Sequence, residues 1–131
     1  VLAMGVDMEC IYALRGAITV EKDFPKDIDE AVKELMDAIM SENELKDEDL
    51  ASIVFSQTSD LKTRNAAAAC RKAGYASNVP LFCCQEAEIS GSLPLCIRVL
   101  ITINHARKKE AKMVYLRGAS NLRPDLVSRS K

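Results

Sequence analysis

The sequence CIRVLITIN occupies residues 96–104 and decides how the chain is expected to fold. Apolar residues stand on both sides of Arg98, and the alternation between polar and apolar positions is weak. Such a run is typical of a strand that is buried on both faces of a sheet. We therefore predict a buried strand over residues 96–104.

The segments on either side of this run complete the expected architecture. Four further strands are predicted, over residues 11–20, 51–57, 81–84 and 113–116. Apolar residues recur at helical spacing over 28–40, and Asp27 is placed to cap that helix. The alanine-rich segment 65–73 should form a second helix that ends at Gly74. This order of elements predicts an α+β fold in which helices cover a mixed sheet.

Composition and charge limit the classes of partner. The chain has 131 residues, enough for one domain with a core, and 48% of them are hydrophobic. Its 18 basic and 19 acidic side chains nearly cancel, so the charge does not predict nucleic-acid binding. No apolar run approaches the roughly 20 residues that cross a bilayer. We expect neither a nucleic-acid nor a membrane partner.

Cysteine and histidine usage bears on redox state and metal binding. The five cysteines are Cys10, Cys70, Cys83, Cys84 and Cys96. An odd number without a regular spacing indicates reduced thiols, which favours a cytoplasmic protein. His105 is the single histidine, so the sequence predicts no metal site and no cysteine–histidine catalytic pair.

Two arginines within predicted strands are the main candidates for chemistry. Arg15 and Arg98 both stand among apolar residues. A buried guanidinium group is costly unless it meets a carboxylate, and its planar fork suits two-point binding of one. The pair therefore suggests a pocket for a small anionic ligand. The alternative is that each arginine pairs with a structural acid such as Glu86 or Asp60.

Four other residues can contribute to such a pocket. Glu86, near a strand end, can accept a hydrogen bond from a ligand hydroxyl, act as an acid or base, or pair with an arginine. The ring of Tyr115 suits a strand, while its hydroxyl can reach a pocket. Arg71 lies on the alanine-rich helix and Arg123 in the segment LRPD, residues 122–125.

Short motifs along the chain point to a particular family. They are RGAITVE at 15–21, DL at 60–61, Cys83 with QE at 85–86, GSL at 91–93, CIRV at 96–99, VYL at 114–116 and LRPDL at 122–126. In order and spacing they resemble the monofunctional chorismate mutases of the Bacillus type. The resemblance covers residues 11–126, which we take as the catalytic domain, with 1–10 as an N-terminal extension and 127–131 as a tail.

The resemblance implies a fold, an assembly and a reaction. The fold would be a pseudo α/β barrel built as a homotrimer, with active sites at the subunit interfaces. The reaction would be the Claisen rearrangement of chorismate to prephenate in phenylalanine and tyrosine biosynthesis, without a cofactor or metal. Electrostatic stabilisation and restriction of the substrate to its compact conformation would supply the catalysis.

It also implies roles for individual residues. Arg98 would contact the ether oxygen and a carboxylate, Arg15 would bind a carboxylate with help from Tyr115, and Glu86 would accept a hydrogen bond from the ring hydroxyl. The expected substrate-binding residues are Arg71, Phe82, Cys83, Leu122 and Arg123. Family members often have Phe-Pro-Ala where this chain has NAA at 65–67, and lysine in place of Ala68. We therefore expect weaker substrate capture.

Two other functions fit parts of the pattern. One is a non-catalytic trimeric protein that binds small carboxylates, which the altered residues 65–68 would favour. The other is an enzyme like the trimeric enamine deaminases, which also use an arginine at a subunit interface. The motifs around Arg98 and Arg123 favour the mutase over both.

Overall fold

A computed structural model describes residues 10–105 and 110–122. Its helices and strands are β1 Cys10–Thr19, α1 Pro25–Glu42, β2 Leu50–Gln57, α2 Ala66–Lys72, β3 Leu81–Gln85, β4 Cys96–His105 and β5 Val114–Leu116. Two short 3-10 helices, η1 (Asp47–Asp49) and η2 (Arg117–Asn121), precede β2 and follow β5. No helix in the described part of the chain is long and apolar enough to cross a membrane.

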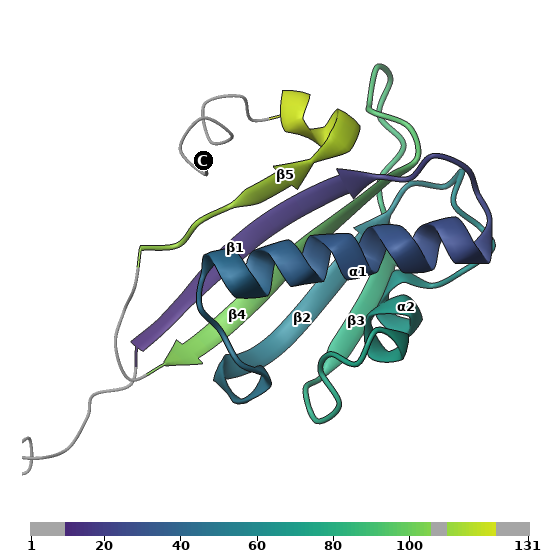
Figure 1. Ribbon diagram of the computed structural model, residues 1–131. Helices are drawn as coiled ribbons and strands as arrows, with labels where there is room; N and C mark the ends of the chain where they lie inside the picture. The colour runs from purple at the N-terminus through teal and green to yellow at the C-terminus, as the bar shows by residue number, and fades with distance from the viewer. Residues whose placement is uncertain (1–9, 106–109, 123–131) are drawn as a thin grey trace, which may run out of the picture.

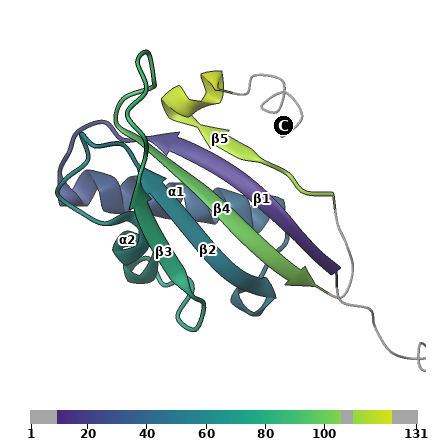
Figure 2. The same ribbon diagram turned by 180° about the vertical axis from the view of Figure 1, so that it is seen from behind.

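The five strands form one mixed sheet in the order β3-β2-β4-β1-β5. The central strand β4 runs antiparallel to β1 and β2, whereas β1 pairs with β5 and β2 with β3 in parallel. Figures 1 and 2 show that α1 and α2 both lie on the same side of this sheet. The α+β prediction of a mixed sheet covered by helices is confirmed.

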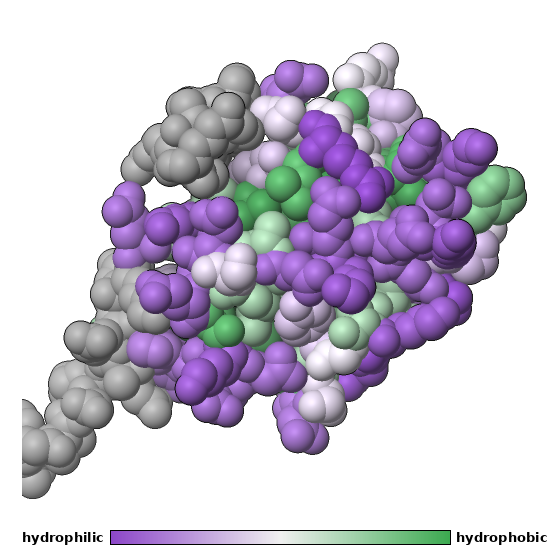
Figure 3. All heavy atoms as spheres, viewed as in Figure 1, coloured by the Kyte–Doolittle hydropathy of each residue, from purple (hydrophilic) through white to green (hydrophobic). Residues whose placement is uncertain are grey.

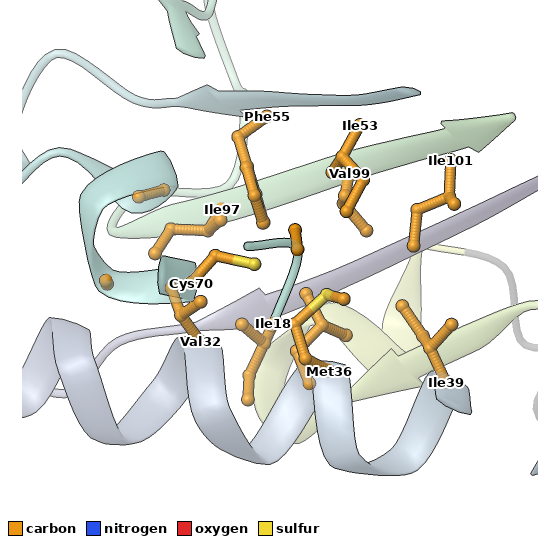
Figure 4. Close-up of a cluster of buried hydrophobic side chains, with 14 of the residues drawn as sticks. Ile18, Val32, Met36, Ile39, Ile53, Phe55, Cys70, Ile97, Val99 and Ile101 are labelled. Carbon is orange, nitrogen blue, oxygen red and sulfur yellow. The ribbon is translucent and has the colours of Figure 1, made fainter. Parts of the chain in front are cut away.

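The core lies between the helices and the sheet face that they cover. Val32, Met36 and Ile39 recur along one side of α1, and all three are fully buried. In Figure 4 they face side chains of the sheet, among them Ile97 and Val99 of β4. The outer side of α1 is largely hydrophilic, as the space-filling view shows (Figure 3). The apolar side of α1 therefore packs against the sheet, as the helical periodicity of residues 28–40 predicted.

The helix ends follow the sequence signals in one case and depart from them in the other. The Asn65 side chain accepts hydrogen bonds from the backbone N–H groups of Ala67 and Ala68, and α2 gives way to Gly74 at φ +94°. The prediction that Asp27 caps α1 is wrong. Pro25 starts the helix after Phe24, which has no capping side chain, and Asp27 lies inside the first turn. Proline suits the first helical turn because the missing N–H would have no partner there.

The central strand corrects a second prediction. β4 is buried mainly on one face: Ile97, Val99 and Ile101 are buried there, whereas on the other face Arg98 is exposed and Leu100 is 45% exposed, and Cys96 is buried at the start of the strand. The reason is that both helices cover the same side of the sheet. Arg15 of β1 is likewise exposed rather than buried. Leu100 on the other side is therefore only partly covered within one copy of the chain.

Gly16 is required where α1 crosses β1. A Cβ atom added there would lie 2.9 Å from Cδ1 of Ile39 and 2.9 Å from the backbone oxygen of Val114. We expect Gly16→Ala to lower the free energy of unfolding by about 1–3 kcal/mol, because the backbone of β5 must shift to admit the methyl group. Urea titration measures this, with Ala13→Ser on the exposed side of β1 as the control. An unchanged midpoint for Gly16→Ala would contradict it.

Candidate active site on the uncovered sheet face

Strand alternation brings most of the candidate residues to one face. Gly16 and Ile97 are buried on the helix side, so their neighbours Arg15 and Arg98 lie on the opposite side, which faces the viewer in Figure 2. We call this side the open face. Phe82 of β3, which is 70% exposed, also lies on it.

The register of the sheet places these side chains in adjoining rows. Arg98 pairs across strands with Ala17 on one side and with Ser56 on the other. Ala17 in turn pairs with Tyr115, and Arg15 lies one repeat along β1 on the same face. Side chains opposite or diagonal to each other on one sheet face are within reach of each other when they are long. Two arginines and a tyrosine thus lie in adjoining rows of the open face, on β4, β1 and β5.

Glu86 completes this group from the end of β3. Its Oε1 lies 3.4 Å from Nε of Arg98 and accepts a hydrogen bond of 2.5 Å from the Ser56 hydroxyl. Its backbone N–H donates to the oxygen of Gln57 at 2.8 Å, which fixes the chain as it leaves the strand. The Arg98 and Glu86 side chains remain 44% and 28% exposed. The two predicted partners therefore meet, and both remain accessible.

The Arg98–Glu86 contact is loose for an ion pair with hydrogen bonds. Charged N–H···O bonds are about 2.7–2.9 Å long, shorter than the observed 3.4 Å. The structure leaves Arg98 accessible to an anion from the open side.

Tyr115 and Leu122 lie beside this group. A small second core contains Ala17, Cys96 and Ala119, and Tyr115 and Leu122 pack against it. The segment after β5 thus returns over the end of β1, held by a hydrogen bond from Gly118 N–H to the Thr19 hydroxyl. Arg123 lies outside the described residues.

Cys83 does not lie on the open face. Its thiol contacts Oε1 of Gln57 at 3.2 Å and belongs to a hollow that is also lined by Asn65. Burial raises the pKa of the Cys83 thiol, with smaller opposing contributions from the N–H groups of Ala66 and Ala67. The raised pKa favours the neutral thiol over the thiolate at this position.

Arg71 is likewise separate from the open-face group. Its guanidinium donates to the backbone oxygens of Ala76, Ser77 and Val79 at 3.0, 3.3 and 3.3 Å. These contacts hold the loop between α2 and β3. The predicted site residues therefore fall into two sets on one chain. The open-face set comprises Arg15, Phe82, Glu86, Arg98, Tyr115 and Leu122. The residues away from that face are called the entrance set: Asn65 and Cys83, which line one hollow, and Arg71, which holds the loop after α2.

Two residues near the site were not predicted from the sequence. Ser56 joins Glu86 on the open face, and Gln57 joins the entrance set from the other side of β2. The Gln57 amide donates to the backbone oxygens of Leu61 and Arg64 and accepts from Ala66 N–H. Neither residue belongs to a motif, and their roles depend on strand pairing. Among residues 10–105 and 110–122, no group of three His, Cys, Asp or Glu side chains could hold a metal ion.

Comparison with known proteins identifies the family. An accessible guanidinium beside a carboxylate can bind a small ligand that offers both an anionic group and a hydroxyl. Residues 11–126 match the family described as chorismate mutase type I, and the chain belongs to that family. Its function is that of a chorismate mutase, an isomerase. This confirms the predicted family and activity and does not favour the carboxylate-binding or deaminase alternatives.

Relatives cover nearly the whole chain. Chorismate mutase AroH from Thermus thermophilus is 41% identical over 120 residues, which are 90% of this chain and 98% of that protein. Chorismate mutase AroH from Bacillus subtilis is 38% identical, over 88% of this chain and 92% of that protein. A solved chorismate mutase from Clostridium thermocellum is 34% identical and superposes with a TM-score of 0.78, covering 84% of this chain and 98% of that one.

Proposed function

We propose that the chain works as a homotrimer in which each active site joins the open-face set of one copy to the entrance set of the next. There it rearranges chorismate to prephenate. The division of the site residues into two sets within one chain carries this proposal. The uncovered apolar side chains of the open face supply a reason for association: Ile11, Val54, Phe82 and Leu100 are between 36% and 74% exposed.

The chemistry of the reaction fits the open-face set. Chorismate carries two carboxylates, a ring hydroxyl and an ether oxygen that gains negative charge as its bond to carbon breaks. Arg98 stabilises that charge, because a fixed cation beside it favours the transition state over the ground state. Arg15 and Tyr115 bind a carboxylate, and the ring hydroxyl donates to Glu86. Holding the substrate in its compact conformation lowers the barrier further.

The entrance set has the complementary task of receiving and enclosing the substrate. Arg71 attracts the dianion, and Cys83, whose pKa is raised by burial, lines the pocket as a neutral thiol. Leu122 of the open-face set and Arg123 then cover the substrate. Asn65 uses its side chain to cap α2. It offers no aromatic surface to the substrate, and weaker capture stays a prediction. The proposed steps transfer no proton to the protein and use no cofactor.

Complementation between variants tests the shared site. Arg98→Ala and Arg71→Ala remove one residue from each set, so each is expected to have a low rate alone. Refolded together at equal amounts, they should recover roughly a quarter of the wild-type rate, because random mixing leaves that fraction of interfaces with both arginines. Each variant refolded alone is the control. A mixture no faster than the mean of the two would contradict a site shared between chains.

We further propose that the protein acts in the cytoplasm. No disulfide joins the cysteines of the described residues, and Cys83 and Cys84 are not buried. Accessible free thiols are typical of a reducing compartment.

A further inference from the structure

We propose that Ser56 is a positioning residue that holds the Glu86 carboxylate ready for the ring hydroxyl of the substrate. This inference rests on the proposed role of Glu86. Ser56 acts through that carboxylate and need not touch the substrate itself. Ser56 is assigned to the site by the pairing of the strands and not by a sequence motif.

The location of Ser56 is set by three neighbouring strands. In the sheet it pairs with Arg98 of β4 on one side and with Cys84 of β3 on the other. Glu86 follows β3 directly, so its side chain returns to the row that holds Ser56 and Arg98. The Ser56 hydroxyl then donates to Oε1 of Glu86 at 2.5 Å, in a partly buried setting. Ser56 thus lies on β2, between β4, which carries Arg98, and β3, which leads into Glu86.

This hydrogen bond affects how the Glu86 carboxylate lies relative to the Arg98 guanidinium. The Ser56 hydroxyl and Nε of Arg98 both approach Oε1, while Oε2 accepts no hydrogen bond from the described residues. Oε2 is therefore available to accept from a substrate hydroxyl. Without Ser56, the attraction between opposite charges would draw the carboxylate toward the 2.7–2.9 Å geometry of a closed ion pair. Both groups would then be less able to meet the substrate.

The first test is the loss and recovery of the hydroxyl. We expect Ser56→Ala to lower kcat about tenfold, the scale of a hydrogen bond to a charged group. Ser56→Thr keeps a hydroxyl at the same position and should restore most of the rate. Ser52→Ala, four residues earlier on β2, is the matched control and should leave kcat unchanged. Thermal unfolding and light scattering establish that each variant folds and assembles as the wild type does.

The second test separates positioning from a general effect on structure. In a Glu86→Ala background, Ser56→Ala should change kcat by less than about twofold, because the group through which it acts is gone. Equal losses in the two backgrounds would overturn the proposal, and so would a Ser56→Ala variant with the wild-type kcat. Wild-type protein that does not convert chorismate would overturn the proposed function together with this inference. If the wild type converts chorismate and the losses from Ser56→Ala and Glu86→Ala are additive, only the inference about Ser56 is overturned.

Discussion

Replacing Arg98 with alanine is expected to lower kcat about a thousandfold while the protein still folds and assembles. Removing one preorganised hydrogen-bond donor from an oxygen that gains negative charge in the transition state lowers kcat by a factor of this size. The Arg98 side chain is 44% exposed, so truncating it leaves no cavity in the core. Its ion pair with Glu86 is partly solvated, and we expect the free energy of unfolding to change by no more than about 1 kcal/mol.

The decrease of chorismate absorbance measures the rate, and urea titration measures stability. Arg98→Lys should recover only part of the activity, since an ammonium group keeps the charge and loses the planar fork. Arg117→Ala is a suitable control, because Arg117 also forms an ion pair on the surface, 2.8 Å from Glu34. A rate for Arg98→Ala within tenfold of the wild type would show that another group stabilises the ether oxygen.

Replacing Leu100 with glutamate is expected to give a monomer with at least a hundredfold lower activity. Leu100 lies on the central strand of the open face and is 45% exposed in a single chain. A carboxylate placed there would lose its water at the proposed interface, at a cost of several kcal/mol without a partner. Because the proposed sites need two chains, dissociation removes activity even though every catalytic side chain is retained.

Light scattering at micromolar concentration reports the assembly, and the chorismate assay reports the activity of the same sample. Phe24→Glu is the matched control: Phe24 is 57% exposed, but it precedes α1 and does not belong to a strand. This control should keep both the wild-type mass and the wild-type rate. A Leu100→Glu variant that stays assembled and active would place the interface elsewhere, and a wild-type monomer would exclude interfacial sites altogether.

Local signals in the sequence were sufficient for most of the fold. The periodicity of 28–40 predicted α1, and the alanine-rich segment 65–73 followed by Gly74 predicted α2 and its end. These predictions succeeded because helix formation and capping depend on residues within a few positions of one another. The cap of α1 was predicted wrongly, since Asp27 and Pro25 both favour a helix start and proline fixed it earlier.

The burial of the strand arginines could not be predicted in the same way. The apolar neighbours of Arg15 and Arg98 suggested strands covered on both faces, whereas the helices cover only one. Which face a helix covers depends on how distant segments cross over the sheet, and no local pattern records this. The sequence therefore predicted that Arg15 and Arg98 on the open face are buried, whereas in a single chain they are exposed.

The sequence by itself determined the family and the reaction and predicted the principal site residues, because its motifs match the family in residue type and spacing. The tertiary structure decided which of those residues meet. Strand register joined Arg98 to Glu86 and brought Ser56 between them, while it left Arg71 and Cys83 in a separate set. The physical reason is that register arises from pairing between segments tens of residues apart, and each pairing turns alternate side chains to opposite faces of the sheet.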